Sequence, residues 1–144
     1  TNIQAALALA QLRRIDELLN YKKWLYESYF SNLKDINGLY LNKFEDNVEP
    51  SHWITAAILT GKNKIKKEII CDYFKDKNID MRPAFYPISS MPPFKKYLTK
   101  HQISKKNINT YYLSKYGIML PSGYNLKKRD ILRICNTLKK IIDK

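Results

Sequence analysis

The side chains that most often carry out catalysis are few in this sequence and stand far apart. His52 and His101 lie in different polar contexts, and neither has a carboxylate, serine or cysteine partner at a recognisable spacing. Cys71 and Cys135 fall on the apolar faces of two predicted helices and form no C-x-x-C pair. We therefore expect surface or partly packed histidines and buried, reduced thiols, with no catalytic residue and no metal site among them.

Two further kinds of site are excluded by the glycines and the acidic residues. The four glycines stand singly at predicted turns, so the chain has no glycine-rich phosphate loop. The 13 acidic residues are too dispersed to suggest a catalytic carboxylate pair. Composition alone therefore leads only to a basic domain without a recognisable catalytic group.

The net charge of +13 requires a decision about nucleic acid as a partner. A nucleic-acid-binding protein more often gathers its basic side chains on one face, with aromatic residues between them. Here the lysines are spread over every segment, in the pairs Lys22-Lys23, Lys66-Lys67, Lys95-Lys96, Lys105-Lys106, Lys127-Lys128 and Lys139-Lys140. Nucleic acid is the least favoured partner, although distributed lysines that converge in space would still bind it.

Length and hydropathy predict one domain over residues 1–144. A chain of 144 residues with 44% apolar residues is large enough to bury a core. No apolar run approaches the roughly 20 residues that cross a bilayer. The first 15 residues include Gln4, Gln11, Arg13 and Arg14, where a signal peptide would have an apolar centre. We expect a cytoplasmic protein without a membrane partner.

The hydrophobic periodicity predicts an α+β fold. Thr1 and Gln4 match the capping-box pattern, and an apolar stripe then continues to Asn37-Gly38, which predicts one long helix. Its early alanines permit close approach of a neighbour, or simply favour helix. Strands are expected at 39–41, 53–59, 79–85 and 118–120, and helices at 65–74, 107–116 and 131–142. Pro83 restricts the third strand to an edge or an end. The pattern predicts a small antiparallel or mixed sheet packed with helices, preceded by the long helix.

Three ordered segments resemble one known family. They are the opening TNIQAALALAQLRRIDELL, the stretch DMRPAFYPISSMPPF at residues 80–94, and the closing YGIMLPSGYNL. The second segment resembles the pattern R-P-x-F-Y-P-x-x-x-x-P-x-[FY], and the third resembles G-x-x-L-P-S-G-x-x-L. Together they are similar to the DegT/DnrJ/EryC1/StrS family of sugar aminotransferases, and most like its perosamine-synthase branch.

The resemblance implies a chemistry that this chain does not complete. Enzymes of that family transfer an amino group from glutamate to a keto sugar carried on a nucleotide, for surface-polysaccharide synthesis. Their pyridoxal phosphate is bound to a lysine that the resemblance places upstream of these residues. The chain is then expected to be the small C-terminal domain of a fold-type I transferase, without a catalytic or cofactor-binding residue. The isolated chain is expected to be inactive, and a homo-oligomer is expected.

Four residues are the substrate-binding candidates that the resemblance implies: Arg82, Phe85, Tyr86 and Ser89. The guanidinium of Arg82 suits the carboxylate of glutamate or the phosphate of a nucleotide-sugar, and a structural ion pair is its alternative. Phe85 and Tyr86 would flank the sugar or the cofactor, or else belong to the core. Ser89 stands where many relatives have histidine, which leaves the sugar specificity open.

The start of the last helix departs from the family pattern. Lys127, Lys128 and Arg129 crowd the positive end of this helix, where relatives place Ser or Thr followed by acidic residues. Asn125 is the expected cap, with Asp130 offsetting little of the charge. Drift at a tolerant surface and an anion site for the nucleotide both remain open. A stand-alone binding domain that has lost catalysis is the alternative function for the whole chain.

Overall fold

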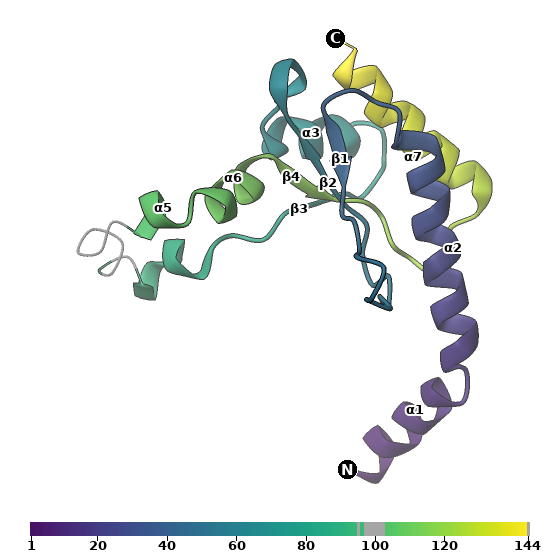
Figure 1. The fold of residues 1–144 in the computed structure, drawn as a ribbon. Helices are drawn as coiled ribbons and strands as arrows, with labels where there is room; N and C mark the ends of the chain where they lie inside the picture. The colour runs from purple at the N-terminus through teal and green to yellow at the C-terminus, as the bar shows by residue number, and fades with distance from the viewer. Residues whose placement is uncertain (95, 97–102, 144) are drawn as a thin grey trace.

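The structure is a computed structural model that describes residues 1–94, 96 and 103–143, and it has the predicted α+β architecture (Figure 1). The α-helices are α1 (Asn2–Leu12), α2 (Ile15–Leu33), α3 (Lys67–Lys75), α5 (Ile103–Lys106), α6 (Ile108–Tyr116) and α7 (Lys128–Ile142). The strands are β1 (Leu39–Leu41), β2 (Ala56–Leu59), β3 (Arg82–Pro83) and β4 (Gly117–Met119). Single 3-10 turns form η1 (Gly61–Asn63), η2 (Ile88–Ser90) and η3 (Pro92–Phe94).

The four strands form one antiparallel sheet in the order β1-β2-β4-β3. Ile118 of the inner strand β4 is opposite Ala57 on one side and Pro83 on the other. Proline has no backbone N–H to donate to a neighbouring strand. The strand that contains Pro83 lies at the edge of the sheet, as predicted. Leu39 and Leu41 are buried while Tyr40 between them is exposed, which shows that the core lies on one face.

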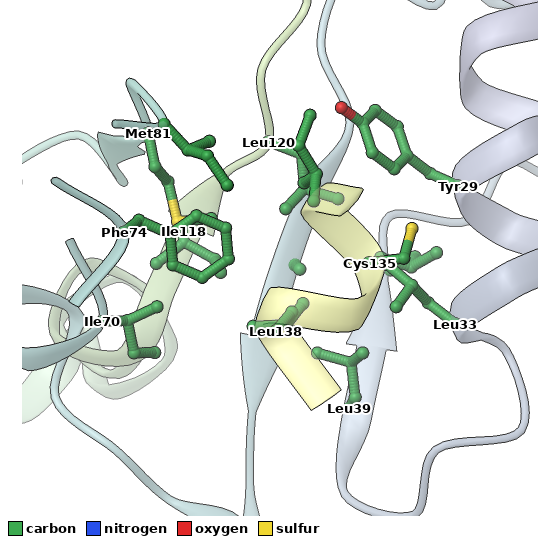
Figure 2. Close-up of a cluster of buried hydrophobic side chains, with 14 of the residues drawn as sticks. Tyr29, Leu33, Leu39, Ile70, Phe74, Met81, Ile118, Leu120, Cys135 and Leu138 are labelled. Carbon is green, nitrogen blue, oxygen red and sulfur yellow. The ribbon is translucent and has the colours of Figure 1, made fainter. Parts of the chain in front are cut away.

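The helices α2, α3 and α7 bring apolar side chains to a common core with the sheet (Figure 2). Phe74 of α3, Leu33 of α2 and Leu138 of α7 are fully buried there, together with Ile118 of β4. Burying side chains of this size contributes roughly 1.5–3 kcal/mol each. Figure 1 shows α2 beside α7, while α5 and α6 extend from the other side of the sheet.

The prediction of one unbroken N-terminal helix is wrong. The helix does begin with the predicted capping box between Thr1 and Gln4, but it ends at Leu12, and α2 starts at Ile15. Arg14 leaves the helical region, with φ −113° and ψ 15°, and its guanidinium donates to Glu17. Neither proline nor glycine marks this break, and the apolar stripe continues across it, so periodicity gave no sign of it.

Two predicted strands are shorter than the apolar runs that suggested them. In the run 53–59 only Ala56–Leu59 pairs, and in the run 79–85 only Arg82–Pro83 does. Beyond β1, the backbone N of Asn42 still donates to the carbonyl of Ala56, but the backbone N of Ala56 donates to the side-chain Oδ1 of Asn42 instead of its carbonyl. Apolar runs identify segments that pack, whereas ladder length also depends on the partner strand.

The cap of the last helix also differs from the prediction. Asn125 does not cap α7, which begins after Lys127. Instead, the carboxylate of Asp130 accepts a hydrogen bond from the backbone N of Lys127 at 2.9 Å. A carboxylate in the first turn stabilises the positive helix end, so Asp130 supplies the cap that was expected from Asn125.

Helix α1 lies away from the sheet, and all of its residues are exposed (Figure 1). Its exposed large apolar side chains are Ile3, Leu7, Leu9 and Leu12. We expect the chain to self-associate through these side chains, since exposed apolar patches of several hundred Å² drive association. Sedimentation velocity should show a weight-average mass that rises above 17.0 kDa with concentration.

The matched variants for this prediction lie on different faces of α1. Leu7→Glu places a charge in the apolar surface and should lower the average mass at a given concentration. Asn2→Asp adds the same charge at an exposed polar position on another face and should change it little. A monomer at every concentration, or equal effects of both variants, contradicts association through α1.

Candidate functional site

Arg82 lies on the edge strand β3, and its guanidinium is accessible to solvent. Its Nη2 donates to Oδ2 of Asp80 at 3.0 Å, and the two side chains are 74% and 77% exposed. Such solvent-exposed ion pairs contribute about 0–1 kcal/mol to stability. The pair orients the guanidinium from one side, so Arg82 can still meet an anionic group from the solvent.

A hollow of about 520 Å³ lies beside Arg82, between the start of β3, the loop after β4 and the first turns of α7. Its lining includes the apolar side chains of Ile79, Met119 and Ile134. Its polar lining residues carry charges of both signs and are Asn78, Asp80, Arg82, Ser122, Asn125, Asp130 and Arg133. Size and mixed polarity suit a small polar ligand.

The loop after β4, which forms one wall of this hollow, is fixed by α2. Tyr29 donates from its hydroxyl to the carbonyl of Pro121 at 2.8 Å, and burial raises the pKa of Tyr29. Lys22 donates from Nζ to Oγ of Ser122 at 2.7 Å, and burial lowers the pKa of Lys22. Tyr21 donates to the carbonyl of Leu126 at 2.8 Å. These hydrogen bonds from α2 hold the loop after β4, which includes residues 120–123, in place beside the hollow.

A further polar cluster joins the break between α1 and α2 to the same loop. Arg14 donates to both carboxylate oxygens of Glu17, at 2.9 and 2.8 Å, and Tyr124 donates to Glu17 as well. The hydrogen bonds from Arg14, followed by that from Tyr124, lower the pKa of Glu17 to about 2. The cluster therefore keeps its ionised form over the neutral range and far into acid.

Gly117 is the first residue of the closing segment that resembles G-x-x-L-P-S-G-x-x-L. Its position requires glycine because neighbouring atoms approach its Cα closely. A Cβ at this position would lie 2.5 Å from the carbonyl oxygen of Leu113 and 2.9 Å from the Cβ of Ala84. Any side chain would therefore push α6 away from β4, or β4 away from β3. The glycine allows the end of α6 to meet the residues that lead into the aromatic pair Phe85 and Tyr86.

Phe85 and Tyr86 are exposed in this chain. The alternative prediction, that both belong to the core, is therefore wrong for residues 1–144. Phe85 is 66% exposed and Tyr86 is 59% exposed. Both line a second hollow of about 670 Å³. It lies mainly among apolar groups, and its lining residues are Phe85, Tyr86, Pro87, Ile88, Ser89, Phe94, Asn107 and Thr110. The structure thus separates Arg82, on the first hollow, from the other three candidates.

Ser89 lies in the 3-10 turn η2, and its side chain connects that turn to α6. Its Oγ is 2.9 Å from the hydroxyl of Tyr111, with either oxygen able to donate. Ser90 adds a bond from its own Oγ to the carbonyl of Pro87 at 2.7 Å. A hydroxyl pair at the border of the second hollow can accept or donate hydrogen bonds to a ligand.

Lys67 is a buried residue near the candidate site that the sequence analysis missed. Its side chain is 1% exposed, and its Nζ donates to the carbonyl of Ala84 at 2.9 Å. The same Nζ lies 3.8 Å from the centre of the Tyr86 ring in a cation–π contact. Lys67 lies on the same helical face as Ile70 and Phe74, three and seven residues later. This spacing could have predicted from the sequence that Lys67 is buried.

Lys67→Met should destabilise the chain by about 1–3 kcal/mol, because the carbonyl of Ala84 would lose its partner in a buried place. The ring of Tyr86 would also lose its cation–π contact. Urea unfolding measures the change. Lys66→Met, an exposed neighbour, serves as the control and should stay within about 0.5 kcal/mol. A Lys67→Met variant as stable as the parent contradicts this role.

The remaining candidates for chemistry are structural or lie outside the described residues. His52 is half-buried, with its ring 4.7 Å from Tyr26 and 5.2 Å from Phe44 between centroids, and burial lowers its pKa. This confirms its partly packed role, whereas His101 is not among the described residues. Cys135 is buried as expected, and Cys71 is half-buried.

The described part of the chain offers neither a metal cluster nor a membrane span. Among residues 1–94, 96 and 103–143, no group of three or more His, Cys, Asp or Glu side chains is placed to hold a metal ion. Over the same residues, no helix combines the length and the apolar character that crossing a bilayer requires.

Comparison with known proteins relates the chain to one family of aminotransferases. Residues 1–139 match the DegT/DnrJ/EryC1/StrS aminotransferase family. The chain belongs to this family. It is 30% identical over 139 residues to the GDP-perosamine synthase of Vibrio cholerae and 30% identical over 138 residues to that of Escherichia coli O157:H7. These matches cover 96% of this chain and 36% and 35% of the two relatives, so the chain spans about a third of their length.

Solved structures show the same fold at lower identity. DesI, determined in the presence of its TDP-sugar product, matches with a TM-score of 0.84 and 18% identity over 97% of this chain and 35% of its own. Helicobacter pylori PseC, an aminotransferase of pseudoaminic acid biosynthesis, matches with a TM-score of 0.82 and 19% identity, covering 98% and 37%. The expected α+β architecture and family resemblance are confirmed.

The described residues do not by themselves fit pyridoxal phosphate, the cofactor that the family implies. A Schiff-base lysine needs a desolvated amine that faces the cofactor. The amine of Lys67 is desolvated, but it is bonded to the carbonyl of Ala84 and covered by Tyr86. The amine of Lys22 is likewise bonded to Ser122. Neither fits, and we assign no cofactor-binding residue.

Proposed function

We infer that this chain supplies the substrate-facing C-terminal part of a pyridoxal-phosphate-dependent nucleotide-sugar aminotransferase. The reaction is amino transfer from glutamate to a keto-deoxy sugar nucleotide for surface-polysaccharide synthesis, as in perosamine formation. The lysine that binds the cofactor belongs to a separate large domain. Without that domain the chain is inactive, and residues 1–144 fold as a single domain.

The observation that carries this inference is the family match over residues 1–139, together with the two perosamine synthases at 30% identity. The exposed guanidinium of Arg82, beside a polar hollow, supports a role in holding an anionic group. Both glutamate and a nucleotide-sugar present such a group. Two further candidates, Phe85 and Tyr86, are exposed beside the second hollow and are available to a ligand.

The wider surroundings are consistent with a part that packs against something else. Helix α1 is exposed along its whole length, and its apolar side chains have nothing to cover them in the isolated chain. A large cofactor domain or a second subunit would bury such side chains. We therefore propose that the complete enzyme is a homo-oligomer.

The test is an amino-transfer assay with glutamate and a GDP-linked keto-deoxy sugar. The chain is compared alone and joined to the lysine-bearing domain that we expect to be encoded immediately upstream. We expect amino sugar, detected by mass spectrometry, only from the joined protein. The proposal fails if the upstream residues encode no lysine-bearing cofactor domain, or if the joined protein forms no amino sugar from any nucleotide-linked keto sugar.

A further inference from the structure

Trp53 and Phe85 form an exposed aromatic pair on the surface of the chain. Trp53 precedes β2, Phe85 follows β3, and the two rings lie 6.5 Å apart between centroids at an interplanar angle of 19°. Trp53 is 65% exposed and Phe85 is 66% exposed. Two large apolar rings so exposed lose much of the burial that usually stabilises them, and such surface pairs are typical of ligand contacts.

The backbone at both rings is fixed by hydrogen bonds. The carbonyl of Trp53 accepts from Oγ of Ser122 at 2.9 Å, and Ser122 belongs to the positioned loop after β4. Phe85 lies between Ala84 and Tyr86, the two residues that Lys67 contacts through its Nζ. The pair is therefore presented from fixed backbone, and less conformational freedom is lost when a ligand binds.

Each member of the pair is connected through the chain to a hollow that has polar groups in its lining. Ile54, next to Trp53, lines the first hollow with Arg82, and Phe85 itself lines the second hollow with Ser89. A ligand that extends from the pair into the first hollow would meet the guanidinium of Arg82. One that extends into the second hollow would meet the side chain of Ser89, whose hydroxyl is in contact with that of Tyr111. A flat ring joined to phosphates and to a hydroxyl-rich group has this distribution of chemistry.

We propose that Trp53 and Phe85 bind the nucleobase of the nucleotide-sugar by stacking, with Arg82 serving its phosphates. This proposal rests on the proposed function, and it assigns the nucleobase of the substrate to the aromatic pair. A nucleobase is the suitable partner because both of its faces are flat and every base stacks on an aromatic ring. A sugar ring offers only scattered C–H groups to such a pair.

The test uses the 144-residue chain, labelled with 15N, and follows the indole Nε1–H signals of Trp24 and Trp53 by NMR. Trp24 packs on Tyr21 with centroids 5.3 Å apart, on α2, and serves as the internal control. Trp24→Phe assigns the two signals. Adding guanosine 5′-diphosphate should shift the Trp53 signal with a dissociation constant in the millimolar range, while Trp24 stays in place.

Matched ligands and variants separate base stacking from charge attraction. Inorganic pyrophosphate and mannose 1-phosphate, at equal ionic strength, should leave the Trp53 signal unchanged because they lack a base. Phe85→Ala should weaken guanosine diphosphate binding about tenfold, the expected loss of one stacked aromatic ring. Tyr40→Ala removes another exposed ring, on β1, and should not change the binding.

The proposal is overturned if the Trp53 signal does not respond to guanosine diphosphate up to about 50 mM, more than tenfold above the millimolar dissociation constant expected for stacking on both rings. It is also overturned if mannose 1-phosphate or pyrophosphate shifts Trp53 as much, or if Phe85→Ala binds unchanged. If any of these outcomes occurs while the joined protein still forms amino sugar, the stacking proposal fails and the proposed function stands. Stacking on Trp53 without any amino transfer would instead support a nucleotide-binding domain.

Discussion

Replacing Arg82 by lysine in the enzyme joined to its cofactor domain should lower turnover roughly 10- to 100-fold with folding unchanged. Lysine keeps the positive charge but loses the two-point geometry with which a guanidinium holds a carboxylate or phosphate. A loss of about 1–3 kcal/mol is expected for such a charge-assisted hydrogen bond. Steady-state kinetics and thermal unfolding of the same preparation measure both effects.

The structure makes the two roles of Arg82 separable. Its ion pair with Asp80 is about three-quarters exposed on both sides, so losing that pair should hardly change the melting temperature. Asp80→Asn, which removes the partner and leaves the guanidinium, is the matched control and should reduce turnover far less. Normal kinetics with a lowered melting temperature in Arg82→Lys would show a structural role and remove Arg82 from the site.

Phe74→Ala should destabilise the isolated chain by about 3–5 kcal/mol, since it removes a fully buried ring from the centre of the core. Figure 2 shows Phe74 among Ile70, Met81 and Ile118, which join α3 to the sheet. Urea unfolding followed by far-UV circular dichroism gives the change in free energy. The measurement also tests whether residues 1–144 unfold as one cooperative domain.

Ile69→Ala is the control on the same helix, because Ile69 is 55% exposed. Its effect should stay near 0.5 kcal/mol, as for other surface substitutions. A gradual loss of signal without a cooperative transition would contradict a single domain. Equal effects of the two variants would contradict the core that α3 forms with the sheet.

Local signals in the sequence were sufficient for several element boundaries. The capping box at Thr1 and Gln4 starts α1, and Gly117 directly follows the end of α6. The restricted φ of Pro83 and its missing donor correctly placed its strand at an edge. In each case, the information lies in one or two residues whose backbone chemistry permits few alternatives.

The parts that sequence reasoning missed depend on contacts between distant segments. The break before Ile15 coincides with the contacts of Arg14 and Glu17, and Tyr124 joins them from more than one hundred residues away. The expected cap at Asn125 was wrong because the carboxylate of Asp130 folds back onto the backbone N of Lys127. Residue types alone do not say which of these pairings forms.

The candidate site was only partly predictable for a similar reason. Arg82 and Phe85 are three residues apart in one motif, yet they line different hollows. Trp53 enters the site through its contact with Phe85, across a separation in sequence that no local pattern reveals. Lys67 looked like one lysine among many, and only its burial against Ala84 and Tyr86 distinguishes it.

The central claim, that this chain holds only part of an active site, is tested most directly by adding pyridoxal phosphate to the purified chain and reducing it with borohydride. We predict no Schiff-base absorbance band and no stoichiometric pyridoxyl mass on a single lysine, because the buried amine of Lys67 is already engaged by Ala84 and Tyr86. A clear band, with one lysine of this chain fully modified after reduction, would contradict the account.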